Sequence, residues 1–261
     1  MARLVLLPLA LMLLLIVGSL FSLFAQLDFI HVVQLLNDVE IRFALALSVS
    51  TALISLLLSS VISLPAAWGM SRLAFPGKRV INILLDLPMV MPPLVVGIGL
   101  LLLLGQEGYV GQLIPQLSQW LFSPLGIIIA QTYVASSIQT RNAYSGFISI
   151  SPQYIHTAYN LGLTPLRTLL LVEIPLIWRS LLSGCVLAMS RALGEFGATL
   201  MLAGATRMKT ETLPIAVFLN IASGDFSLAV GCALLLILFS ALLLVILHLL
   251  QQKGTPNVKS A

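Results

Sequence analysis

Long apolar stretches alternate with short polar connections along most of this chain. A helix needs about 20 mostly apolar residues to cross the hydrocarbon core of a bilayer. Six stretches meet or approach that length, and we predict helices over residues 4–25, 43–70, 80–104, 124–140, 175–203 and 227–250. The first is longer than the apolar core of a signal peptide, so we expect it to be retained. The pattern therefore predicts an all-α, polytopic transmembrane helical bundle with six spans.

Composition supports this interpretation. Of the 261 residues, 59% are hydrophobic and 8% are charged, whereas soluble domains carry about 25% charged residues. A chain so poor in charge must hide most of its surface from water, which excludes a soluble enzyme. The sequence pI of about 9.3 does not indicate nucleic-acid binding, because the basic residues are scattered singly between apolar runs.

The placement of the basic residues predicts the orientation. Cytoplasmic connections are enriched in Lys and Arg. If the N-terminus lies inside, eight basic residues are cytoplasmic and three are external. The eight are Arg3, Arg72, Lys78, Arg79, Arg141, Arg167, Lys253 and Lys259, and the three are Arg42, Arg207 and Lys209. We therefore expect cytoplasmic N- and C-termini, a first helix and outer loop over 1–42, and a short cytoplasmic tail over 251–261.

Prolines interrupt the third stretch. Residues 86–93 read DLPMVMPP, and each proline removes a backbone donor and disfavours helical geometry in the residue before it. Non-helical backbone at membrane depth is tolerated where it is buried in protein or lines a wet cavity. The break is therefore either a packing kink or a bend that shapes a pathway, in which case Pro92 and Pro93 are pathway candidates.

Two opposite charges occur within the fifth stretch. Arg191 and Glu195 are four residues apart, so one helix face would bring them together. An ionised residue at the bilayer centre costs about 2.5–3.5 kcal/mol, so both side chains must face protein or water. Either the pair locks packing, or Arg191 lines the route of an anion while Glu195 holds its side chain. Gly194 and Gly197 would allow another helix to approach closely.

The sequence contains no pattern for catalysis or for a metal. GxxxxGK[ST], HExxH, paired CxxC and GxSxG are all absent, and the three histidines lie in separate segments. We therefore expect no catalytic residue, no metal site and no cofactor in this chain. Active transport would draw its energy from an ion gradient or from a partner subunit.

A short amphipathic helix is predicted between the fourth and fifth stretches, over about 151–166. Ser151 is a suitable cap and Pro152 a suitable first helical residue, while Gly162 and then Pro165 end the helix. Such a helix on the inner face either docks into a groove on another protein or rests on lipid.

This segment resembles the EAA–x3–G–x9–I–x–LP motif in the inner-membrane subunits of ATP-binding-cassette (ABC) importers. The matching residues are His156, Thr157, Ala158, Gly162, Val172, Ile174 and Pro175. His156 and Thr157 depart from the acid and the first alanine of the motif, whereas Val172 and Ile174 are conservative replacements. The resemblance implies that the helix is a coupling helix, which fits into a separate ATPase subunit that uses ATP and Mg.

The resemblance extends over about residues 43–250. Residues 71–103 resemble the molybdate, tungstate and sulfate permease branch, and residues 190–219 are most similar to molybdate importers. This implies a type I ABC importer permease fold in a bacterial inner membrane, working as a homodimer with two ATPase subunits and an extracytoplasmic anion-binding protein. Molybdate is the expected substrate, with tungstate or sulfate as alternatives. An ion-gradient-driven secondary transporter is the competing class, although only one proline break and no repeat are visible.

Overall fold

The computed structural model describes residues 2–26 and 37–252, and every regular element within those ranges is helical. In chain order the elements are α1 (Ala2–Ala25), α3 (Val39–Arg72), α4 (Lys78–Val90), α5 (Pro93–Leu104), α6 (Tyr109–Leu113), α7 (Pro115–Gln119), α8 (Pro124–Ser149), α9 (Pro152–Asn160), α10 (Pro165–Thr168), the π-helix η1 (Leu169–Glu173), α11 (Ile174–Leu193), α12 (Gly197–Ala203), α13 (Leu213–Ser223) and α14 (Phe226–Gln252). The prediction of an all-helical chain is confirmed for the residues described.

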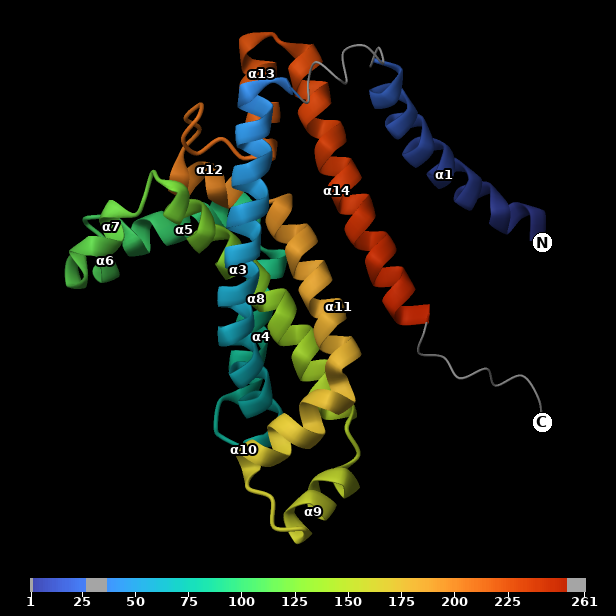
Figure 1. Cartoon of the computed structure of the whole chain (residues 1–261), viewed down its shortest axis with the longest axis vertical. Coiled ribbons are helices and arrows are strands. Elements are labelled where there is room, and N and C mark those ends of the chain that lie inside the picture. The colour runs from blue at the N-terminus through green and yellow to red at the C-terminus, as the bar shows by residue number, and fades with distance from the viewer. Residues whose placement is uncertain (1, 27–36, 253–261) are drawn as a thin grey trace.

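The long helices α3, α8 and α11 form the centre of the molecule, and α4 packs against α8. Figure 1 shows α9 and α10 at one end of this bundle and α13 at the other, and we call these the α9 end and the α13 end. The short helices α5, α6, α7 and α12 project to one side of the bundle, while α14 packs on α11 and α13. α1 lies away from the three central helices and contacts α14.

Small side chains on one face of α3 allow the central helices to pack closely. The buried positions recur every three or four residues and include Ala44, Ser48, Ala52, Ser55, Ser59, Ser63 and Ala67. Small residues let helix backbones approach, and their hydroxyls can bond across the contact. The Ser55 hydroxyl lies 3.2 Å from Oε1 of Gln131 on α8, and the Gln131 amide donates to the Ala192 carbonyl of α11 at 3.0 Å. Gln131 therefore links all three central helices.

The structure corrects the fourth predicted stretch. α8 runs from Pro124 to Ser149, so it has 26 residues and is much longer than the predicted 124–140. The end of the helix was missed because its second half is polar, and those polar side chains, such as Gln139 and Thr140, are buried against other helices rather than exposed to water. The apolar pattern alone therefore placed the end of this helix too early.

Five helices in the described ranges are both long and apolar enough to cross a membrane. They are Leu6–Ala25, Val39–Arg72, Pro93–Leu113, Pro165–Leu193 and Phe226–Leu249. α8 is long enough but too polar to qualify by composition. Six spans therefore remain a prediction.

The predicted break in the third stretch is confirmed, with one refinement. α4 ends at Val90 and α5 begins at Pro93, so Met91 and Pro92 form the break. Pro88 lies inside α4, where the helix continues past it. Only the last two of the three prolines therefore interrupt the helix.

A second break, which the sequence analysis did not predict, divides the fifth stretch. α11 ends at Leu193 and α12 begins at Gly197. Glu195 therefore does not share a continuous helix face with Arg191, and that part of the prediction is wrong. No proline marks this break. The sequence signal that remains is the pair of glycines at 194 and 197, which lower helix propensity on both sides of Glu195.

The helices that follow the two breaks pack against each other through glycines. A Cβ on Gly97 of α5 would lie 2.9 Å from the Ala198 Cα, and a Cβ on Gly197 of α12 would lie 2.8 Å from the Pro93 Cβ. The prediction of a close approach is thus confirmed for Gly197. It is wrong for Gly194, where an added Cβ would meet only carbonyls of the preceding turn of α11.

Some predictions lie outside the described residues. These are the part of the outer loop at 27–36, the tail at 253–261 with Lys253 and Lys259, and the side chain of Arg3. The orientation derived from the basic residues stays a prediction, and so do the domain boundaries.

Candidate functional site

The helix predicted at the inner face forms as α9, and its ends follow the sequence signals. Pro152 occupies the first helical position as predicted, but the side chain of Ser151 makes no capping hydrogen bond, so the predicted role of that side chain is wrong. At the other end Gly162 has a φ of +82°, its N–H donates to the Tyr159 carbonyl at 2.9 Å, and Leu163 N–H donates to the Ala158 carbonyl at 3.1 Å. These two hydrogen bonds form a Schellman motif, in which Gly162 adopts a left-handed backbone conformation that favours glycine. The predicted stop at Gly162 is confirmed.

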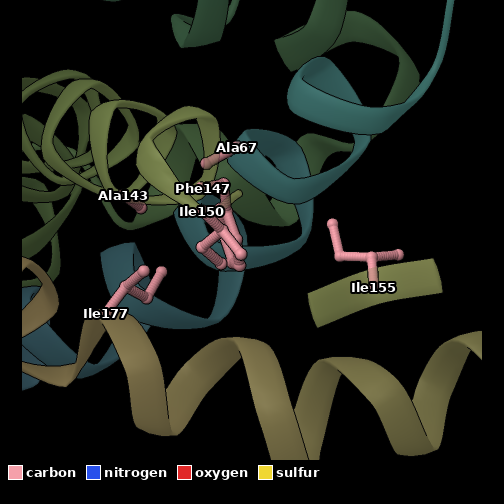
Figure 2. Close-up of a cluster of buried hydrophobic side chains, with 6 residues drawn as sticks. All are labelled: Ala67, Ala143, Phe147, Ile150, Ile155 and Ile177. Atoms are coloured by element: carbon pink, nitrogen blue, oxygen red, sulfur yellow. The ribbon is translucent and has the colours of Figure 1, made fainter. Parts of the chain in front are cut away.

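One face of α9 is anchored in the bundle. Ile155 and Ala158 are buried, and Ile155 belongs to a hydrophobic cluster contributed by α3, α8, α9 and α11 (Figure 2). Its buried members are Ala67, Ala143, Phe147, Ile150, Ile155 and Ile177. The cluster fixes α9 against the ends of the long helices.

The opposite face of α9 is open. Tyr154, His156, Thr157, Tyr159 and Leu161 are all exposed, and we call this set the α9 surface. The side chains of Tyr159 and Leu161 are 43% and 77% exposed, although both residues are largely apolar. The result is a rim of aromatic and apolar side chains with no cover in one copy of the chain.

The seven residues of the resemblance lie in two adjoining places. His156, Thr157, Ala158 and Gly162 belong to α9 and its end, whereas Val172, Ile174 and Pro175 lie where η1 passes into α11. α9 packs against η1, so the two groups are brought together. A π-helical turn inside an α-helix is rare and is often associated with functional sites.

Glu173 lies at this junction, and the sequence analysis missed it. It is buried and pairs with Arg72 at the end of α3, with Nη2 and Oε2 2.6 Å apart. Trp68 Nε1 donates to the other carboxylate oxygen at 3.3 Å, and Arg72 Nη2 also donates to the Phe147 carbonyl of α8 at 3.3 Å. An ionisable residue inside the apolar run LLLVEIPLIW was the signal that could have found it.

A second ion pair joins α4 to α8. Arg141 Nε donates to Asp86 Oδ1 at 2.8 Å, and Arg141 Nη1 donates to Asn82 Oδ1 at 3.2 Å. The sequence analysis used Arg141 only to assign orientation and did not single out Asp86. Together with the Arg72–Glu173 pair, it ties α4, which precedes the first break, and the η1 turn to the centre of the bundle.

The pathway candidates converge where the two breaks meet. Arg191 Nη1 lies 2.6 Å from Glu195 Oε2, so the predicted pairing is present even though the helix ends between the two residues. Glu195 is fully buried, and its Oε1 accepts a hydrogen bond from Ala198 N–H at 2.9 Å, which caps α12. The Arg191 side chain is 36% exposed. Glu195 therefore holds a partly open guanidinium and fixes the start of α12 at the same time.

Pro92 and Pro93 lie at the other break, and Pro93 is in contact range of Gly197 at the start of α12. The two breaks are thus neighbours in space, although they are about a hundred residues apart in the chain. No group of three or more metal-ligating side chains occurs in the ranges 2–26 and 37–252.

Comparison with known proteins gives a consistent result. The sequence model of the family described as "binding-protein-dependent transport system inner membrane component" matches residues 63–259. A putative molybdenum transport system permease protein of Bacillus subtilis is 36% identical, over 74% of this chain and 84% of its own length. A sulfate transport system permease protein of Synechocystis is 34% identical, over 85% of this chain and 80% of its own.

The fold also matches a solved structure. A bacterial ABC transporter involved in the import of the acidic polysaccharide alginate has a chain that superposes with a TM-score of 0.75 and 15% identity, covering 99% of this chain and 96% of that one. At this identity the similarity concerns the fold alone.

Proposed function

The chain belongs to the family of binding-protein-dependent transport system inner membrane components, and from this premise we propose that it forms the translocation pathway of an ABC importer for molybdate. It is a multi-pass inner-membrane protein and a transport subunit, and the ATPase of such systems is a separate subunit. The sequence resemblance to molybdate importers over residues 190–219 supports molybdate over tungstate and sulfate. All three are tetrahedral dianions, and the relatives include both molybdenum and sulfate permeases.

The proposal rests on the α9 surface and on how α9 is attached to the bundle. A short helix with an uncovered rim is attached to the bundle through the Ile155 cluster, and the η1 turn on which it packs is held by the Glu173–Arg72 pair. Because these contacts reach α3, α8 and α11 together, a displacement of α9 is passed to the three central helices. A partner ATPase that grips α9 and closes on ATP and Mg would move the bundle in this way.

The proposed assembly has two copies of this chain, two ATPase subunits at the α9 end and an extracytoplasmic anion-binding protein at the α13 end. In this arrangement α8 is the sixth span and both termini are cytoplasmic. The second copy is part of the proposal because the sequence resemblance to ABC importer permeases implies a homodimer. Arg191, partly exposed and held by Glu195, is the side chain proposed to face the passing anion.

The α9 surface is tested with Gly162→Trp. No atom lies within 4 Å of a Cβ at this position, so the bulky ring projects outward and would block a partner's groove. Gly162→Ala reproduces the left-handed strain of about 1–2 kcal/mol without the bulk. Gly224→Trp is the matched control, because Gly224 has the same φ of +82° and the same open surroundings near the α13 end.

We expect Gly162→Trp to insert normally but to lose co-purification of the ATPase and ATP-dependent uptake, while Gly162→Ala and Gly224→Trp retain the ATPase. Normal uptake by Gly162→Trp would contradict the proposal. Substrate identity is measured separately as isotopic uptake of molybdate in competition with tungstate and sulfate.

The ion-gradient-driven alternative has one observation in its favour, since two broken helices meet in this fold as they do in secondary transporters. It predicts uptake that persists without any ATPase and collapses with the ion gradient. Uptake in vesicles that lack ATP decides between the two classes.

A further inference from the structure

A pocket with two basic side chains in its lining lies at the start of α4, on the α9 end of the molecule. It has a volume of about 470 Å³ and is lined by Phe75, Gly77, Lys78, Arg79, Asn82 and Tyr144. A second, much smaller pocket shares Asn82 and Tyr144 with it and is lined by Asp86 and Arg141 between α4 and α8. We call the two together the α4 pocket. It is separate from the α9 surface and from the two helix breaks.

The α4 pocket carries uncompensated positive charge. Lys78 Nζ uses one of its three protons on the Leu73 carbonyl at 3.0 Å, and Arg79 is exposed and makes no hydrogen bond or ion pair with any described residue. The one carboxylate in the cavity, Asp86, is already paired with Arg141. Two cations at the first turn of a helix are also electrostatically unfavourable, because that end of the helix carries a partial positive charge. An anion in the pocket would relieve both repulsions.

The pocket also offers hydrogen-bond donors without acceptors. Arg141 Nη1 donates to Asn82 Oδ1, so the oxygen of this amide is occupied and its NH₂ group is left to face a ligand. Asn82 follows Lys78 by four residues and Arg79 by three, which places all three side chains on one side of α4. Tyr144 is held beside them under the Arg141 guanidinium, 5.9 Å from the ring centroid. Convergent donors with surplus positive charge are the chemistry that binds phosphate and other oxyanions.

The flank of α4 that continues from the pocket is apolar and uncovered in one copy of the chain. Val80, Ile83 and Leu84 are each more than half exposed. A polar, basic end that adjoins an apolar flank fits an anionic phospholipid, with its phosphate in the pocket and its acyl chains along α4. We propose that the α4 pocket is a binding site for a tetrahedral oxyanion group, supplied by an anionic phospholipid headgroup or by a free inorganic oxyanion.

The test uses the full-length chain, purified in mild detergent and stripped of lipid. Binding of phosphatidylglycerol and phosphatidylcholine is measured by native mass spectrometry, and binding of inorganic phosphate and molybdate by titration calorimetry. Arg79→Gln removes one pocket cation. Arg167→Gln is the matched control, since Arg167 is an exposed basic residue near the same end of the molecule that does not line the pocket. Asn82→Asp keeps the oxygen that Arg141 contacts but replaces the amide donors with negative charge.

For a lipid headgroup we expect phosphatidylglycerol binding to weaken about tenfold in Arg79→Gln, the loss typical of one charge-assisted hydrogen bond, and more in Asn82→Asp. Arg167→Gln should bind like the wild type, and phosphatidylcholine should bind weakly to all four proteins. If inorganic phosphate or molybdate shows this pattern and phosphatidylglycerol does not, the source is the free anion. If no probe distinguishes Arg79→Gln and Asn82→Asp from the wild type, the site does not exist. The proposed function does not depend on this result.

Discussion

The buried pair between Arg72 and Glu173 allows a quantitative test of how the junction of η1 and α11 is held. The two side chains differ in burial, since Glu173 is 1% exposed and Arg72 is 23% exposed. Replacing Arg72 by Ala leaves a carboxylate without a countercharge in the interior, and removing one partner of a buried pair typically costs about 3–5 kcal/mol. We therefore expect Arg72→Ala to lower the free energy of unfolding by about that amount.

Glu173→Gln should lower the free energy of unfolding by less than Arg72→Ala does. The remaining Arg72 guanidinium can still reach water and still bonds to the Phe147 carbonyl. The carboxylate accepts from Trp68 on one oxygen and from Arg72 on the other, whereas an amide must turn its NH₂ toward one of these donors. Because one hydrogen bond is lost and one donor is left unsatisfied, the free energy of unfolding should fall by about 1–3 kcal/mol.

The double variant Arg72→Met/Glu173→Leu removes both charges and should be more stable than Arg72→Ala alone, because apolar replacement of a buried pair is often nearly neutral. The assay is denaturant unfolding of the purified protein in detergent, followed by Trp fluorescence, with ATPase co-purification measured in parallel. If Glu173→Gln is more damaging than Arg72→Ala, or if the double variant is the least stable, the assignment of Glu173 as the buried, dependent partner is wrong.

Three further predictions concern other parts of the chain. Gly197→Ala should destabilise the protein by about 1–3 kcal/mol, because its Cβ would approach the α5 backbone to 2.9 Å. The control Gly99→Ala should not, since a Cβ there meets no atom within 4 Å. Equal unfolding midpoints for the two variants would show that α5 and α12 do not touch. Arg191→Ala should lower anion uptake more than it lowers the amount of inserted protein, as measured by isotopic uptake and Western blotting. Equal losses in both would show that the residue only supports packing. Burial raises the pKa of the Glu211 carboxyl, partly opposed by its hydrogen bond from Met208 N–H, with Glu40 and Asp38 raising it and Arg207 lowering it. Because the charged form is disfavoured in the folded state, Glu211→Gln should be more stable than the wild type above the raised pKa, and the difference should shrink as the pH falls through it; a difference in thermal midpoint that is constant from pH 4 to pH 8 would contradict this cause.

Sequence reasoning worked best where a local rule decides the backbone. The start of α9 at Pro152, its end at Gly162 and the break before Pro93 each follow from the geometry of one or two residues. Such signals act over a few positions, so they can be read without knowing what packs nearby. The resemblance to ABC importer subunits was carried by the same segment, and the family comparison confirmed it.

The features that the sequence did not predict are products of tertiary packing. The second half of α8 looks like a connection because of residues such as Gln139, whose amide donates to the Ser60 hydroxyl of α3 at 3.0 Å. Glu173 and Asp86 look like ordinary charges until Arg72 and Arg141, from other helices, are found beside them. A partner that is distant in the chain produces no periodic pattern in a single sequence, so these ion pairs could be identified only from the structure.

The polar interior of α8 has a consequence for how the protein is made. A helix with Gln131, Gln139 and Arg141 partitions poorly from the translocon into lipid when it is alone. The side chains of these three residues donate to acceptors on α3, α4 and α11, and α11 is synthesised later. We therefore expect nascent α8 to leave the translocon together with α3 and α4, and to finish its integration only when α11 emerges from the ribosome.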